Sequence, residues 1–562
     1  MTRAHGNGIA APQLAAALYL GLAAVLLALI LVRTHGHFSY CLDDPYIHLA
    51  LAERLRHGLY GLNTGEPASP SSSILWPLLF VPFASTAIMP WLPLILNLAC
   101  GTATAWLLGV LANEIPSRHR DTAGAPWRTN LLAVLFVLAF NLFGLAFTGL
   151  EHSLQVLLCI ACAVGVVRAM RGDRVPEWVL VAAILLPSVR YEGLLITVAL
   201  AIALVGARAW RRAVAIVLAS AIIPAAFSVF LHHLGLPWFP LSVLVKSSYK
   251  LADTSSPLHR VAHLLLQIPK YGLFDSERLP QIVITVALAA LVWKHRRTRS
   301  LLFGLTAATF VSAVQVVLGP SGWFFRYEIY ALAFTVPILL AATALPGTAH
   351  RTESDLGTRS RPSLEVTSPA LQARAPQSAN VRTHALLAVA VLAAIYLRPL
   401  VNVPRAALGI YEQQFQLGRL FGEMYHTPVA VNDLGWVSYR RTPDQYTLDL
   451  YGLGSYEAFR TKEKDRNAAW LDAITREHHV GLVAIYPEWF THGIPANWAA
   501  VAKLCAPDVD TNLGPVSKRF MVYQTSEADP VSVSTAIEQW RATVPPHVTV
   551  QLHPTNNSET CQ

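Results

Sequence analysis

Residues 14–32 read LAAALYLGLAAVLLALILV, and residues 37–48, HFSYCLDDPYIH, follow after a short polar link. The apolar run is about long enough to cross a bilayer at about 1.5 Å per residue. A cleaved signal peptide would have a shorter apolar region and a small-x-small cleavage site, whereas RTHGHF follows here. We therefore expect an uncleaved first membrane span, with the acidic pair Asp43 and Asp44 just beyond it.

The composition predicts a protein that crosses the membrane many times. Of its 562 residues, 54% are hydrophobic and 14% are charged, whereas a soluble protein carries about 25% charged residues. Apolar runs after the first predict ten further spans, at residues 92–112, 129–148, 150–170, 178–189, 193–208, 213–231, 279–293, 301–318, 327–345 and 384–401. The fold class predicted is therefore a mainly α-helical polytopic membrane protein with about 11 transmembrane helices.

Lys and Arg in the short loops predict the orientation of these spans. Four basic clusters, within residues 118–128, 168–174, 208–212 and 294–299, share the cytoplasmic side only if the N-terminus is also cytoplasmic. Residues 74–90, which contain three prolines, must then be interfacial or re-entrant. The formal charge of +9 is mostly this topology signal, and we find no motif for a nucleic-acid partner.

The same topology predicts the domain organisation. A transmembrane domain, 1–345, has outer loops at 33–91 and 232–278, and a polar segment, 346–383, is predicted to be a disordered cytoplasmic linker. The last span, 384–401, leads into an extracytoplasmic α/β domain, 402–562, in which strands near 429, 446, 480 and 518 alternate with a helix at 456–477. Cys41, Cys505 and Cys561 are predicted to lie outside the cytoplasm, where disulfides are permitted; Cys505–Cys561 is one possible pair, and spacing leaves the connectivity open.

The acidic pair is the strongest candidate for a functional site. Ionisable groups at the edge of a membrane are costly unless they face water, a cation or a substrate. Asp44 and Pro45 are predicted to be the N-cap and first residue of an amphipathic helix that ends at Gly58.

Other charged residues are predicted to lie at the same membrane face. They are Glu151, Arg190, Glu192, Lys246 and Arg326. Each alone can be an interfacial cap or part of a salt bridge such as Arg190–Glu192, and the basic loop around Lys246 can be a membrane anchor or a phosphate patch. Together they predict a shared cavity. There a carboxylate can deprotonate an acceptor hydroxyl while Arg and Lys hold a phosphate, as sugar transfer from a polyprenyl-phosphate donor requires.

Several segments of the chain resemble GT-C fold glycosyltransferases. The likeness is to bacterial polyprenyl-phosphate-sugar-dependent enzymes of the terminal arabinofuranosyltransferase or mannosyltransferase type. It rests on DDPYIHLALAERL (43–55), GLYGLN (58–63), SPSSSILW (69–76), TGLE (148–151), RYEG (190–193), RY (326–327), VAVNDLG (429–435) and LDLYGL (448–453). Pro45 and Tyr191 depart from the family pattern, and so does the serine-rich turn at 69–73, which lacks the usual Tyr-Thr before Ser-Pro.

The resemblance implies an inverting sugar transfer in the bacterial cytoplasmic (inner) membrane, onto a cell-envelope glycan, lipid or protein acceptor. One carboxylate of the pair would be the general base. An N-cap carboxylate accepts backbone N–H bonds that lower its pKa, so Asp43 is predicted to be the base and Asp44 an orienting group. Many relatives use a divalent cation (Mg, Mn or Ca), which Asp44 would bind. The predicted substrate-binding residues are His48, Glu151, Arg190, Glu192, Lys246 and Arg326, although His48 is also explained as an interfacial histidine.

Two other functions are compatible with the sequence. A transporter or flippase for a lipid-linked saccharide would favour inverted repeats and mid-membrane charges, and we find neither. A non-catalytic envelope assembly protein would bind glycan through the outer domain, where Trp436, Tyr439, Tyr446, Tyr451 and Trp489 can stack on sugars or form core.

Overall fold

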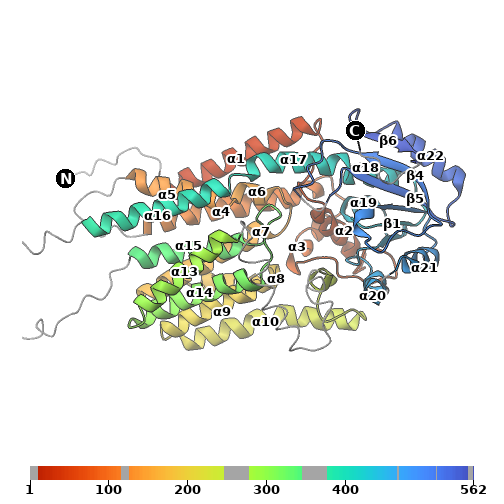
Figure 1. Cartoon of the computed structure of the whole chain (residues 1–562). Coiled ribbons are helices and arrows are strands. Elements are labelled where there is room, and N and C mark those ends of the chain that lie inside the picture. Colours follow the sequence, from red (N-terminus) through yellow and green to blue (C-terminus); the bar gives the residue numbers. More distant parts are fainter. Residues whose placement is uncertain are drawn as a thin grey trace, which may run out of the picture.

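The computed structural model describes residues 10–114, 126–245, 278–344, 376–464, 467–513, 516–554 and 561. In these residues a bundle of helices carries a mixed sheet domain at one end (Figure 1). Lys246 lies outside the described residues. The chain is therefore mostly helical, with a small C-terminal sheet domain.

The helical bundle is the larger part of the molecule. Its helices are α1 (Ala11–Arg33), α4 (Leu92–Glu114), α5 (Pro126–Ala139), α6 (Leu142–Ala146), α7 (His152–Arg171), α8 (Glu177–Val189), α9 (Gly193–Gly206), α10 (Trp210–His233), α13 (Leu279–Lys294), α14 (Arg299–Leu318), α15 (Ile329–Ala344), α16 (Pro376–Ile395) and α17 (Pro399–Glu412). By length and composition, six helical segments of the described chain can cross a membrane: Ala11–Arg33, Met89–Asn113, His152–Arg171, Trp210–His233, Arg299–Leu318 and Leu386–Met424. Five further apolar helices are shorter, which suggests membrane association without fixing the number of crossings.

Two predicted segments differ from the structure, and a third, residues 74–90, contains no long helix. Residues 74–90 contain only the short helices α3 (Leu75–Leu78), η1 (Val81–Phe83) and η2 (Met89–Trp91), the last running on into α4. The span expected at 129–148 is broken at Asn141, whose backbone is left-handed (φ 47°) and whose buried amide donates to the Phe324 carbonyl at 2.9 Å. Disorder at 376–383 is a wrong prediction because α16 begins at Pro376; residues 346–375 lie outside the described chain.

The basic loops of the bundle gather at one end. Arg212 donates to the Val175 carbonyl at 3.0 Å, and Arg299 to the Val205 carbonyl at 3.1 Å. These bonds join the loops after α7, α9 and α13, at helix ends that point away from the sheet domain (Figure 1). Three of the four basic loops predicted to share one side, within 168–174, 208–212 and 294–299, therefore lie together; the fourth, 118–128, falls largely outside the described residues.

The C-terminal domain is built on a six-stranded sheet in the order β2-β1-β3-β5-β4-β6. Its strands are β1 (Val429–Val431), β2 (Thr447–Asp449), β3 (Leu482–Ile485), β4 (Ala499–Cys505), β5 (Arg519–Gln524) and β6 (Thr549–Leu552). β2, β1 and β3 are parallel, whereas the others pair antiparallel. The predicted strands β1, β2, β3 and β5 are confirmed, and β4 and β6 were not expected.

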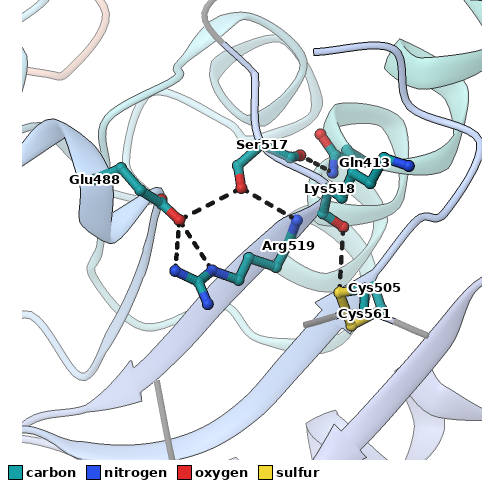
Figure 2. Close-up of a disulfide and its surroundings, with 7 residues drawn as sticks. All are labelled: Gln413, Glu488, Cys505, Ser517, Lys518, Arg519 and Cys561. Carbon is teal, nitrogen blue, oxygen red and sulfur yellow. Dashed lines mark hydrogen bonds and ion pairs between the residues drawn. A yellow bond between two sulfur atoms is a disulfide. The ribbon is translucent and has the colours of Figure 1, made fainter. Parts of the chain in front are cut away.

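Helices cover this sheet. The expected helix at 456–477 is two helices, α20 (Tyr456–Lys464) and α21 (Ala469–Glu477). The other helices are α18 (Gln414–Arg419), η6 (Leu420–Met424), α19 (Gly435–Arg440), η7 (Pro487–Trp489) and α22 (Pro530–Arg541). Cys505 and Cys561 form the disulfide that the sequence allowed, at the end of β4 (Figure 2).

Helix α2 (Asp44–Arg56) joins the bundle to the sheet domain. Its Tyr46 ring stacks on Trp436 with centroids 3.9 Å apart. Its Arg54 guanidinium donates to the carbonyls of Ser438 at 3.2 Å and Arg441 at 2.6 Å. Because these partners come from α19 and the residue after it, α2 and α19 hold the two parts of the molecule together.

Candidate active site

A cavity of about 1190 Å³ is lined by residues of the helical bundle and of the sheet domain. Residues after β1, β2 and β3, including Asp433, Tyr451 and Trp489, line it from the domain side. Ligands of open α/β sheets bind outside the carboxyl ends of their parallel strands. The cavity therefore has the position of a ligand site.

The bundle side of the cavity contains five of the residues predicted from sequence. They are Asp43, Asp44, Arg190, Glu192 and Arg326. His48 and Glu151 do not line the cavity but lie behind it. The prediction that charged residues from distant segments share one space thus agrees with the structure for the five lining residues.

Asp44 and Arg326 form an ion pair in this cavity. Arg326 Nη1 lies 3.0 Å from Asp44 Oδ2, and the side chain of Arg326 is 4% exposed whereas that of Asp44 is 40% exposed. Arg326 Nη2 also donates to the Tyr327 hydroxyl at 2.9 Å. The carboxylate is therefore accessible from the cavity, while the guanidinium is held in place.

The backbone before Arg326 has an unusual conformation. Trp323, Phe324 and Phe325 have positive φ angles of 52°, 63° and 59°. Left-handed backbone costs an L-residue roughly 1–2 kcal/mol, and consecutive residues rarely adopt it. The Asn141 amide holds the Phe324 carbonyl in this turn at 2.9 Å. Such backbone strain is concentrated at functional sites. Here the strained turn directly precedes Arg326, which lines the cavity.

Asp43 has a different environment from Asp44. It is buried, and its two carboxylate oxygens accept the backbone N–H groups of Gly435 at 2.5 Å and Trp436 at 2.9 Å. The prediction that Asp44 caps the helix is wrong, because α2 already begins at Asp44 and Asp43 occupies the N-cap position without a capping bond. The Asp43 carboxylate accepts hydrogen bonds from the N–H groups of α19 instead of from those of its own helix.

Asp433 is a site residue that the sequence analysis missed. It is the second residue after β1 and accepts a hydrogen bond from the Gln414 amide at 2.8 Å. Burial raises the pKa of Asp43 well above its usual range, and the Asp433 carboxyl raises it further. Burial also raises the pKa of Asp433, to about 6. Both carboxyl groups therefore hold a proton more readily than an exposed aspartate does. A carboxylate at the carboxyl end of a buried parallel strand was the signal that could have identified Asp433.

This pair makes stability depend on pH. A carboxyl group with a raised pKa binds more protons in the folded protein, so its contribution is full below pH 3.8 and is lost as the pH rises through about 6. We expect the melting temperature of the detergent-solubilised protein to fall across this window. Asp433→Asn should flatten this fall. The difference in melting temperature between pH 4.5 and pH 7 should become smaller by about 2–4 °C. The exposed Glu538→Gln should retain the wild-type slope, and an unchanged slope in Asp433→Asn would contradict the raised pKa of Asp433.

A buried ionic cluster supports the cavity floor. Glu151 is fully buried, with Arg190 Nη1 2.8 Å and His48 Nε2 3.7 Å from its carboxylate. The Ser72 hydroxyl donates to the same carboxylate at 3.0 Å. Arg190 also pairs with Glu192 at 2.9 Å, so the salt bridge considered from sequence is present. Arg190 thus reaches the cavity from a position fixed by two carboxylates.

The predicted metal ligand Asp44 is already paired with a cation. Because Arg326 lies 3.0 Å from Asp44 Oδ2, a divalent ion at that oxygen would be repelled by the guanidinium. Elsewhere in the described chain, Glu412, Asp508 and His547 bring metal-ligating atoms together. The structure therefore offers another location for a metal.

Comparison with known proteins covers only part of the chain. A family model described as a domain of unknown function (DUF8728) matches residues 405–523. This range runs from α17 to β5 and includes Asp433, Tyr451 and Trp489 of the cavity. No curated protein matches the chain.

Proposed function

We propose that this protein is a membrane glycosyltransferase that moves a sugar from a polyprenyl-phosphate donor to an acceptor outside the cytoplasm. The observation that carries the proposal is the accessible Asp44 carboxylate, 3.0 Å from a buried arginine, in a cavity between apolar helices and a sheet domain. A polyprenyl phosphate has an apolar tail that suits the helices and a charged phosphate that suits the arginine. The GT-C resemblance of the sequence points to the same activity.

We assign the general base to Asp44 in place of Asp43. Both carboxylate oxygens of Asp43 accept hydrogen bonds from the backbone of α19, whereas Asp44 is half-exposed and lines the cavity. Asp44 removes the proton of the acceptor hydroxyl as that oxygen attacks the anomeric carbon. The bond from this carbon to the phosphate oxygen breaks, and Arg326 and Arg190 stabilise the departing phosphate. A single displacement inverts the anomeric configuration.

The acceptor side of the cavity suits a carbohydrate. Tyr451 and Trp489 line it from the sheet domain, with ring centroids 5.2 Å apart. Aromatic rings can stack on the apolar faces of sugars, so we assign these two residues to a glycan acceptor. Trp436 is buried against Tyr46 and takes no part.

We also propose eleven crossings, a cytoplasmic N-terminus and an outer C-terminal domain in a bacterial cytoplasmic membrane. Two observations support this orientation. The basic loops gather at the end away from the sheet domain, as the positive-inside rule requires. The disulfide Cys505–Cys561 belongs to the oxidising side.

The activity is testable with purified protein in liposomes. We expect radiolabelled polyprenyl-phosphate sugar to lose its label to a glycan acceptor, with one polyprenyl phosphate released per sugar transferred. Label that crosses the bilayer with its lipid intact would instead identify a transporter or flippase. Acceptor binding without consumption of any polyprenyl-phosphate sugar would identify an assembly protein, and either result would overturn the proposal.

A further inference from the structure

A cluster of metal-ligating side chains lies beside the cavity without lining it. It consists of Glu412 at the end of α17, Asp508 after β4 and His547 before β6. The candidate ligand atoms of all three residues lie within 4.8 Å of one another. In this arrangement His547 Nε2 is 2.6 Å from Glu412 Oε1. Three distant segments of the chain thus bring one nitrogen and two carboxylates to a single point.

The burial of Glu412 distinguishes this cluster from a chance group of surface acids. The side chain is fully buried, and among the described residues its Oε2 atom has no hydrogen-bond partner. A buried carboxylate oxygen without a partner is costly, because no hydrogen bond compensates for the water that it loses on folding. A cation between the three residues would satisfy this oxygen, and His547 alone does not.

We propose that Glu412, Asp508 and His547 bind a divalent transition-metal ion, with Zn²⁺ the best match. Zn²⁺ binds imidazole nitrogen and carboxylate oxygen at about 2.0–2.2 Å, which places its ligand atoms within the observed mutual spacing. Ca²⁺ and Mg²⁺ prefer six or more oxygen ligands, so the histidine argues against them. Two carboxylates and a neutral imidazole balance the double positive charge.

A fourth ligand position is within reach of the first span. His35, two residues after α1, has its ring centroid 6.2 Å from that of His547. A water molecule or His35 can complete a tetrahedral site after a small side-chain movement. With His35 the ion would connect α1, α17 and the edge of the sheet.

The position of the ion predicts a structural role. α17 is the helix that enters the sheet domain, and β4 and β6 form the edge of the sheet. Asp508 lies three residues after Cys505, which pairs with Arg519 of β5 and is joined by a disulfide to Cys561 (Figure 2). The neighbouring residues Gln413 and Val509 line the cavity. An ion here would therefore hold the domain edge at a set distance from the bundle.

The test uses tag-free, full-length protein in detergent after dialysis against a chelator. Titration with Zn²⁺ should give one tight site per chain, measured by calorimetry and by elemental analysis after desalting. Glu412→Gln and the exposed Asp508→Asn should each weaken that site by at least the roughly 10- to 100-fold typical of removing an outer-shell partner. The control is His478→Ala, because His478 pairs with Glu457 at 3.0 Å outside the cluster and should leave Zn²⁺ binding unchanged.

Thermal melting gives a second readout that does not depend on activity. Zn²⁺ should raise the melting temperature of the wild type and of His478→Ala, and not that of Asp508→Asn. Absence of stoichiometric Zn²⁺ in the wild type would overturn the proposal. Equal Zn²⁺ affinity in Asp508→Asn, or Ca²⁺ binding as tight as Zn²⁺ binding, would overturn it as well.

Discussion

Asp44→Asn should reduce sugar transfer by about 10²–10⁴-fold, the range that general-base catalysis contributes, while the protein stays folded. The asparagine keeps the size of the side chain. Its amide oxygen can still accept a hydrogen bond from Arg326, which lies 3.0 Å from the carboxylate in the wild type. It cannot take the proton of the acceptor hydroxyl. The measurement is the initial rate with labelled polyprenyl-phosphate sugar at saturating acceptor, together with the melting temperature.

Two further variants give this result its meaning. Glu53→Gln removes a negative charge from the same helix, where Glu53 accepts hydrogen bonds from Ser85, and should keep most activity. Asp43→Asn should lower both stability and activity, because its amide presents N–H to the N–H groups of α19. Activity above a tenth of wild type in Asp44→Asn would remove Asp44 as base. Loss of activity in Asp43→Asn without any loss of stability would return that role to Asp43.

Gly435→Ala should detach the sheet domain from the acidic pair and abolish most activity. An added Cβ would lie 2.1 Å from the Asp43 backbone oxygen and 2.6 Å from its carboxyl carbon. Because backbone stands in the way, α19 or Asp43 must move, at a cost typical of overpacking, about 1–3 kcal/mol. We expect a lower melting temperature and faster limited proteolysis between the bundle and the domain.

The matched control is Gly21→Ala, since Gly21 lies within α1 and an added Cβ there meets nothing within 4 Å. It should leave activity, melting and proteolysis unchanged. If Gly435→Ala behaves like this control, then the contact between Asp43 and α19 is not what assembles the site.

The sequence allowed much of this architecture to be predicted because the decisive signals were local. Apolar runs marked the bundle helices, and short β-branched runs marked β1 and β3. β4 and β6 were missed for local reasons too. β4 reads AAVAKLC, with a fully buried Lys503 and little alternation, and β6 is a short edge strand.

The division of roles between Asp43 and Asp44 could not be predicted from local sequence. It depends on hydrogen bonds between Asp43 and residues 392 and 393 positions away. The expected capping bond was a sound local argument, but the N–H groups of α19 compete for the same carboxylate. The role of Asp433 was hidden for the same reason, because only folding places β1 beside the acidic pair.

The hydrogen bonds between Asp43 and α19 also have a consequence for biogenesis. Gly435 and Trp436 are synthesised 392 and 393 residues after Asp43. Until the sheet domain is translated and folded, the cavity lacks the wall that carries Asp433 and Trp489. Under the proposed function, chains that lack the sheet domain should therefore be unable to transfer sugar.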